Sequence, residues 1–152
     1  MKLRFTLPSA AIFAALALYP LATWADEDAE LAEQPAAVQK TAHEQIGKSE
    51  IEEVEPSFEE GQHATEVEYT EDGKKMAVVI APDGTLIQKE YRMSPSDAPA
   101  VIKAGVKMLF PDGKISHIKE VQRKDSKFFE ISVKSGDKSH RLTIDESGKP
   151  IK

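Results

Sequence analysis

The sequence matches itself without a gap when it is shifted by 64 positions. The shift carries Pro35-Ala36 onto Pro99-Ala100 and Gly84 onto Gly148. Most of the other matched pairs are apolar: Val38/Ile102, Ile46/Phe110, Ile51/Ile115, Val54/Ile118, Val67/Ile131, Val78/Leu142 and Ile80/Ile144. Apolar residues and glycines determine packing and turns rather than a reaction. The repeat therefore predicts a structural unit that occurs twice.

Each unit begins with the pattern of an amphipathic helix. Val38, Ala42 and Ile46 recur every four residues in the first unit. The corresponding apolar residues of the second unit are Val101, Ile102, Val106, Leu109 and Phe110. In that unit Ser94 has the chemistry of an N-cap and Pro95 that of the first helical residue, which predicts where the helix begins.

Strand patterns follow each helix. Residues 65–70 and 128–133 alternate between apolar and polar side chains, and residues 51–55 and 114–121 are expected to be strands as well. Glycine-containing turns at 71–74 and 135–138 predict hairpins. The sequence thus predicts an α+β fold: a duplicated helix-plus-antiparallel-strands unit with the helices on one face of the sheet. Units of about 60 residues are marginally stable alone, so we expect the two to share one sheet or core.

The amino-terminal residues have the pattern of a secretory signal. Lys2 and Arg4 precede an apolar stretch from Ala10 to Leu18, and small residues follow up to Ala25. We predict a signal peptide over 1–25 that is cleaved after Ala25, which implies a periplasmic or secreted protein without stable membrane insertion. An uncleaved membrane anchor is the alternative. The acidic, Ala-rich segment 26–33 contains one Leu and is predicted to be a flexible acidic leader.

Composition excludes several classes of function. The absence of cysteine removes disulfides, cysteine-based zinc sites, iron–sulfur clusters and thiol catalysis. The chain has 20 Lys+Arg against 26 Asp+Glu, a formal net charge of −6. This charge repels polyanions, so nucleic acid is not an expected partner.

Several short motifs resemble a known family. They are Pro35-Ala36-Ala37-Val38, the strand pattern at 65–69 followed by Asp72-Gly73-Lys74, the segment 80–86, and their counterparts beginning at Pro99-Ala100. These residues resemble the PepSY-like family, which is related to β-lactamase-inhibitor-like modules. The resemblance implies two tandem copies, repeat 1 over 34–90 and repeat 2 over 91–152. It also implies a small exported module that binds or restrains other proteins.

No motif for catalysis, cofactor binding or metal binding stands out. His43, His63, His117 and His140 are not at the spacings typical of metal ligands, and the Glu-rich segments lack the spacing of a calcium loop. The serines do not lie in a Gly-x-Ser-x-Gly sequence, and the glycines are too dispersed for a phosphate loop. We therefore predict a non-enzymatic protein with no catalytic residues, no bound metal and no cofactor.

A candidate partner-binding patch follows from the strand alternation. If Val67 and Ile131 point to the core, a common set of side chains lies on the opposite face: Glu66, Glu68, Val79, Phe128, Glu130 and Arg141. An aromatic anchor surrounded by charged groups is typical of a binding surface. Alternatively, Phe128 covers the edge of the core or fills a seam between the two units.

The sequence as a whole predicts an exported non-enzymatic protein-binding module. Its partner would be an unidentified envelope or extracellular protein, which it inhibits or regulates. The alternative is a periplasmic metal or small-ligand binding protein that uses histidines and carboxylates.

Overall fold

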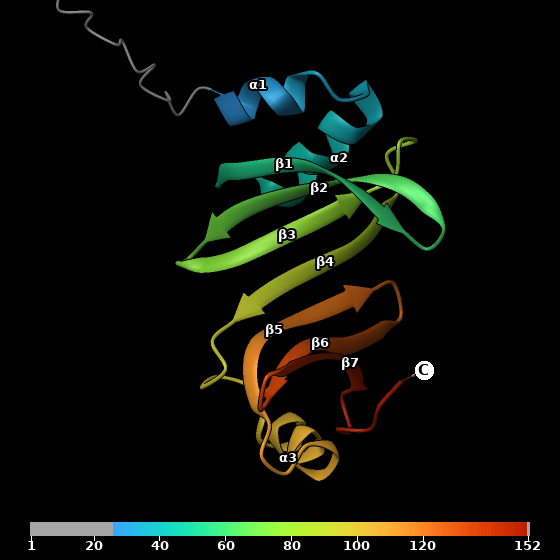
Figure 1. Ribbon diagram of the computed structural model, residues 1–152. Helices are drawn as coiled ribbons and strands as arrows, with labels where there is room; N and C mark the ends of the chain where they lie inside the picture. The colour runs from blue at the N-terminus through green and yellow to red at the C-terminus, as the bar shows by residue number, and fades with distance from the viewer. Residues whose placement is uncertain (1–25, 152) are drawn as a thin grey trace, which may run out of the picture.

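The computed structural model describes residues 26–151, so the predicted signal peptide and its cleavage site lie outside the described residues. Within 26–151 the chain forms three helices and seven strands (Figure 1). Their bounds are α1 Asp26–Ala32, α2 Ala36–Ile46, β1 Glu50–Glu59, β2 Gln62–Glu71, β3 Lys74–Ile80, β4 Leu86–Met93, α3 Ala100–Leu109, β5 Lys114–Arg123, β6 Ser126–Ser135 and β7 Lys138–Asp145.

All seven strands belong to one antiparallel sheet, in the order β1-β2-β3-β4-β5-β6-β7. The predicted α+β class with an antiparallel sheet is confirmed, and strands from both halves of the chain share the sheet. The central strand β4 crosses the predicted boundary between residues 90 and 91. The segment around this boundary is therefore the middle strand of the shared sheet.

The predicted hairpins are present, and the strands around them are longer than predicted. Residues 72–73 and 136–137 form the turns between β2 and β3 and between β6 and β7. The strand expected at 51–55 runs from Glu50 to Glu59 and includes Pro56. A proline is compatible with β1 because β1 is an edge strand, in which the backbone N–H groups that point away from β2 have no neighbouring strand to bond.

The amino-terminal segment corrects the prediction of a flexible leader. Residues Asp26–Ala32 form helix α1, and Leu31 is 1% exposed. This single apolar side chain packs with Val38 and Ala42 of α2. Burial of one leucine side chain contributes about 2 kcal/mol, which helps to hold the short helix on the rest of the fold.

The start of α3 is a second correction. The helix begins at Ala100 after Pro99 rather than at Pro95. The segment from Ser94 to Asp97 forms a turn instead, in which the Asp97 amide donates a hydrogen bond to the Ser94 carbonyl at 2.9 Å. Pro99 has the extended ψ of a residue outside a helix, and its fixed φ leads directly into the first turn.

Two separate apolar clusters hold the helices against the sheet. The first joins α1 and α2 to β1–β3 through Leu31, Val38, Ala42, Ile46, Val54, Val67, Tyr69, Val78 and Ile80. The second joins α3 to β5–β7 through Ala98, Ile102, Val106, Ile118, Phe129, Ile131, Val133 and Ile144. Figure 1 shows α2 beside the first three strands and α3 beside the last three. Val67 and Ile131, which the alternation predicts to point to the core, are buried, and so are Tyr69 and Val133 two residues further along the same strands.

Each apolar cluster is closed by a glycine turn that touches a helix. In the first half, the Thr41 hydroxyl donates a hydrogen bond to the Gly84 carbonyl oxygen at 2.6 Å. In the second half, Gly105 stands 64 positions after Thr41, and a Cβ at Gly105 would lie 2.2 Å from the Gly148 carbonyl oxygen. The glycine in α3 therefore allows close contact with this turn. Among residues 26–151, no helix is long and apolar enough to span a bilayer.

Candidate functional site

The six residues of the predicted patch lie on one face of the sheet. Glu66 is paired with Val79, and Val79 with Gln88. The next row runs across the sheet through Glu68, Ala77, Glu90, Val121 and Phe128. Directly paired residues point to the same side, and every second residue along a strand does so too. This side, opposite the two apolar clusters and carrying also Arg92, Lys119, Glu130, Ser132 and Arg141, is called the polar face below.

The apolar members of the patch are not available to a partner. Val79 is fully buried against Ala64, Ala81 and Ile87. Phe128 is 8% exposed, and the Arg123 guanidinium lies 5.2 Å from its ring centre. The side chains of Glu66 and Glu68 are 17% and 12% exposed, that of Glu130 is 39% exposed, and Arg141 is an exposed residue. The accessible part of the patch is therefore charged rather than aromatic.

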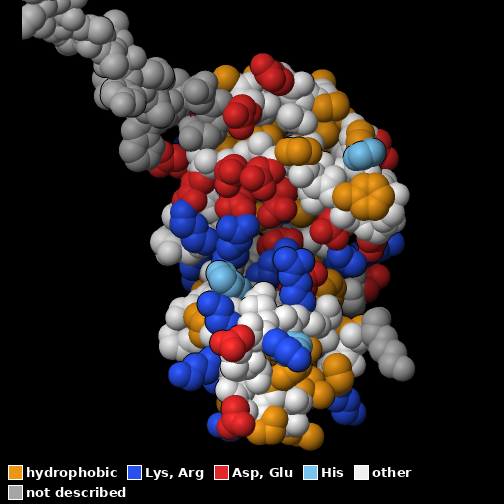
Figure 2. All heavy atoms as spheres, viewed as in Figure 1, with side chains coloured by type: hydrophobic (Ala, Val, Ile, Leu, Met, Phe, Trp, Pro, Cys, Tyr) orange, Lys and Arg blue, Asp and Glu red, His pale blue; other side chains and the backbone are white. Residues whose placement is uncertain are grey.

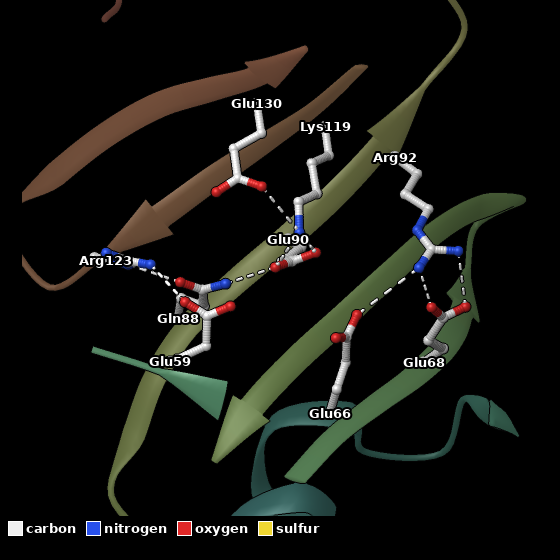
Figure 3. Close-up of polar contacts among 9 residues, drawn as sticks. All are labelled: Glu59, Glu66, Glu68, Gln88, Glu90, Arg92, Lys119, Arg123 and Glu130. Atoms are coloured by element: carbon white, nitrogen blue, oxygen red, sulfur yellow. Dashed lines mark hydrogen bonds and ion pairs between the residues drawn. The ribbon is translucent and has the colours of Figure 1, made fainter. Parts of the chain in front are cut away.

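A buried polar network lies at the centre of the polar face (Figure 3). Gln88 and Glu90 of β4 are each 1% exposed. The Lys119 ammonium donates hydrogen bonds to both carboxylate oxygens of Glu90 at 2.8 Å, and the Gln88 amide donates to Glu90 Oε1 at 2.5 Å. A buried carboxylate with these partners avoids most of the free-energy cost of leaving water. This network was not predicted from the sequence, although two strongly polar residues in a central strand are its signal.

Arg123 of β5 connects this network to the first hairpin. Its Nε donates a hydrogen bond to Gln88 Oε1 at 2.7 Å, and its two terminal nitrogens lie 2.8 Å from Glu59 Oε2 and 3.4 Å from Glu60 Oε1. In a flat sheet, β1 and β5 would be about 19 Å apart, four strand spacings. These contacts therefore require the sheet to curl toward its polar face. One guanidinium thus holds the tip of the β1–β2 hairpin over the central strands.

The surroundings of the network favour the ionised form of Lys119 but disfavour the ionised form of Glu66. Burial, followed by the charge of Glu90, raises the pKa of Glu66 to about 6, against the opposing effect of Lys119 and Arg92. Burial alone would lower the pKa of Lys119, but hydrogen bonds and charges from Glu90 and Glu130 raise it above its ordinary value. Lys119 is therefore a permanent cation at neutral pH.

Arg92 forms the link between the centre of the face and its acidic side. It donates two hydrogen bonds to the Glu68 carboxylate and lies 3.8 Å from Glu66 Oε1 (Figure 3). Figure 2 shows acidic side chains gathered over β1 and β2, with basic side chains immediately beside them over the following strands. The polar face is thus divided into an acidic and a more basic half.

An open groove of about 620 Å³ lies on the basic half. The polar-face side chains that line it are Arg92, His117, Lys119, Glu130, Ser132, Arg141 and Thr143. Ion pairs hold Lys119 and Arg92 in place, while Arg141 and His117 are exposed at the groove. Such a surface can recognise charged groups through hydrogen bonds and ion pairs.

The four histidines lie in different environments. His63 packs against Phe58 with ring centres 5.5 Å apart, and His140 packs against Phe110 at 4.6 Å. His43 lies on α2, and His117 lies at the groove. Over residues 26–151, no three His, Asp or Glu side chains are grouped so that they could hold a metal ion.

Comparisons with known proteins identify the fold. The sequence matches no protein-family model and no curated protein. Similar solved structures include one from Bacteroides eggerthii described as a "putative periplasmic" protein, with a TM-score of 0.65 and 15% identity, covering 78% of this chain and 86% of that one. A DUF2874 family protein from Bacteroides ovatus has a TM-score of 0.64 and 14% identity, with coverages of 78% and 85%.

A third similar structure bears on the family resemblance. It is a BLIP-like protein from Bacteroides fragilis, with a TM-score of 0.61 and 13% identity, covering 78% of this chain and 84% of that one. This similarity agrees with the β-lactamase-inhibitor-like resemblance at the level of the fold. At these identities the comparison concerns the fold alone.

Proposed function

We propose that this chain is an exported, non-enzymatic module that binds an envelope or extracellular protein and thereby inhibits or regulates it. The binding surface is the polar face of the sheet. The observation that carries the proposal is the set of accessible charges on this face, which are fixed by a buried and fully paired network around Glu90 and Lys119.

The geometry of the face supports recognition of a protein. Arg92, Lys119 and Glu130 are held by ion pairs in defined positions. Side chains that are already ordered lose little conformational entropy when a partner binds. Charges in fixed positions also favour one partner over others and accelerate its association. The face therefore has the properties of a specific, polar interface.

The proposed export rests on the amino-terminal pattern. A basic start, a short apolar stretch and small residues before Ala25 are typical of a cleaved signal. The similar structure from Bacteroides eggerthii carries a periplasmic description, which agrees with this location.

We also propose that the chain consists of two tandem PepSY-like copies whose helices share one face. The bounds of β5 and β6 follow those of β1 and β2 by 64 residues at both ends. Gly84 and Gly148, 64 positions apart, both contact the helix of their own half through Ala37 and Val101. Equal spacing of elements and of their contacts is the pattern that a duplication leaves.

The proposal is tested by capturing a protein partner from the native envelope and identifying it by mass spectrometry. The affinity of the purified partner is measured for the protein, for the variant Glu66→Gln/Glu68→Gln/Glu130→Gln, and for the control Glu30→Gln/Glu33→Gln/Glu44→Gln. Both variants remove three carboxylates, the first from the polar face and the second from the helices and the residue after α1.

We expect the polar-face variant to bind at least ten-fold more weakly and the control to bind within two-fold of the parent, with circular dichroism unchanged in both. Equal losses in the two variants would assign binding to another surface. Failure to retain any partner would contradict the proposed function altogether.

A further inference from the structure

We infer that the groove over β5–β7 binds a carboxylate carried by a protein segment, and that this segment continues with basic or uncharged residues toward β1 and β2. The inference rests on the proposed function, because it specifies the chemistry of the partner at the same face. It starts from the side chains of His117, Ser132 and Arg141, which form no ion pair with other residues of 26–151.

His117, Ser132 and Arg141 form one row across three neighbouring strands. His117 is paired with Ser132, and Ser132 with Arg141, so adjacent side chains of the row lie about 5 Å apart. All three line the groove. In the described part of the chain, their side chains take part in no hydrogen bond or ion pair, and His117 and Arg141 are exposed. The row offers guanidinium and hydroxyl donors, which are suited to an oxyanion.

Arg141 differs from the other cations of the groove in having no partner carboxylate among residues 26–151. Lys119 is already paired with Glu90 and Glu130, and Arg92 with Glu68. An added carboxylate therefore pairs with Arg141 without breaking an existing ion pair. The groove, at about 620 Å³, has room for an acidic side chain together with neighbouring backbone.

The equivalent positions in the first half of the sheet are more acidic, and Ala77 stands at the position that corresponds to Arg141. A shift of 64 residues relates His117 to Glu53, Lys119 to Glu55, Ser132 to Glu68 and Glu130 to Glu66, and the strand pairing of these positions is the same in both halves. A hydrogen bond with Glu55 and its negative charge raise the pKa of Glu53, which shows that like charges are crowded here. This half repels a second acidic group, so it selects against a uniformly acidic ligand.

The spacing of the strands sets the length of the segment. Strands β2 and β6 are separated by four strand spacings, which is about 19 Å along the sheet and less across its curled polar face, so an extended chain covers this distance with at most about six residues. The net charge of −6 disfavours a polyanion such as nucleic acid or an anionic membrane. A protein segment with a carboxylate at one end and lysine or arginine about six residues away fits both halves of the face.

The probe for this inference is a terminally blocked decapeptide with two aspartates near one end and two lysines near the other, separated by glycine and serine. Its binding is followed through the backbone amide signals of the ¹⁵N-labelled protein. We expect concentration-dependent shifts at His117, Ser132 and Arg141. The variant Arg141→Glu should bind at least ten-fold more weakly, while Lys138→Ala, which removes a cation from the other side of the same strand, should bind like the parent.

A peptide with aspartates in place of both lysines should also bind at least ten-fold more weakly. Absence of shifts with the mixed peptide, or equal binding by Arg141→Glu, would overturn the inference. Inorganic phosphate that binds the row as tightly as the mixed peptide would show a site for free anions instead of a protein segment. If the peptide fails while the polar-face variant still loses its protein partner, the proposed function stands and only this inference is wrong.

Discussion

At the scale of single residues, Glu66 is the clearest case of a carboxylate whose surroundings disfavour its ionised form. Its side chain is 17% exposed, and the nearest cation, Arg92, is 3.8 Å away and shared with Glu68. Burial and the charge of Glu90 raise the pKa of Glu66 to about 6 from 4.5. The folded state therefore binds a proton at this site more tightly than the unfolded state does.

Glu66→Gln should consequently stabilise the protein at neutral pH. Stability falls as the pH rises wherever the native state holds more protons, which for Glu66 is the interval from 4.5 to about 6. The shift already includes the opposing attraction of Lys119 and Arg92 and corresponds to about 2 kcal/mol. Because solvent screens a partly exposed group, we expect a gain of about 1–2 kcal/mol at pH 7 and no gain at pH 4. Urea unfolding at the two pH values measures it. An equal effect at both would show that ionisation of Glu66 is not the cause.

Alternation along the strands predicted which side of the sheet each residue of the patch faces, but not how deeply it lies. The pattern allowed Val79 and Phe128 to be apolar contacts for a partner, or Phe128 to cover the edge of the core or a seam between the units; both residues are buried on the polar face. Their burial depends on the curl of the sheet and on Arg123, which brings a hairpin from 64 residues away. Periodicity carries no information about curvature, so the sequence could not distinguish an exposed anchor from a covered one.

At the scale of elements, the β1–β2 hairpin depends on one side chain for its position over the sheet. Arg123→Ala should lower the free energy of unfolding by about 2–3 kcal/mol, because it removes hydrogen bonds to Glu59 and to the buried Gln88. Arg123→Lys should not restore this loss, since an ammonium lacks the planar fork that reaches both partners.

Chemical denaturation measures the stability of these variants, and hydrogen exchange at residues 59–62 reports the release of the hairpin tip. Lys124→Ala, which removes a neighbouring exposed cation, serves as the control and should change stability by less than about 0.5 kcal/mol. Unchanged protection of the hairpin tip in Arg123→Ala would show that Arg123 does not hold it.

Turn chemistry made the hairpins predictable, whereas the ends of elements were set by contacts distant in the sequence. The glycines at 73 and 136 adopt positive φ in their turns, as their positions between alternating strands predict. Helix α1 was not predicted, because it is stabilised by the packing of Leu31 on α2 rather than by a periodic apolar pattern of its own. The hydrophobic stripe of α2, by contrast, was predicted residue by residue.

At the scale of the whole molecule, the two apolar clusters do not meet. One gathers on β1–β3 and the other on β5–β7 with α3. On the cluster side of the β4–β5 pairing the residues are Lys89, Tyr91, Glu120 and Gln122, followed by one apolar pair, Met93 and Ile118, at the second cluster. The halves are therefore joined by backbone hydrogen bonds between β4 and β5 and by the packing of Met93 on the second cluster. On the polar face they are also joined by the Glu90–Lys119 pair and by the contacts of Arg123 with the first half.

Glu90→Ala should accordingly weaken the junction of the halves. Without Glu90, the partly exposed Lys119 has only Glu130 as a partner, and the buried Gln88 amide has lost its acceptor. We therefore expect a loss of about 2–3 kcal/mol. The double variant Glu90→Leu/Lys119→Met should lose much less, because it leaves no unpaired charge. Glu120→Ala removes a carboxylate from the other side of the same junction and should cost less than about 1 kcal/mol.

Urea unfolding followed separately by circular dichroism and by the amide signals of each half measures these effects. The parent protein should unfold in one transition, and the two halves of Glu90→Ala should separate in their midpoints. A loss for Glu90→Ala no larger than that for Glu120→Ala would show that the buried pair does not stabilise the junction.

The serial order of the strands bears on how the chain acquires its structure. Each strand pairs with the strand that precedes it in the sequence, so most pairings close only a short loop. The chain therefore loses its conformational entropy in small steps, one pairing at a time. Proteins whose sheets are built from such neighbouring pairings have a low contact order, and they fold faster than β-rich proteins whose paired strands are distant in the sequence. A polypeptide that emerges from a pore amino-terminus first could add its strands in sequence, with no early strand left waiting for a late partner.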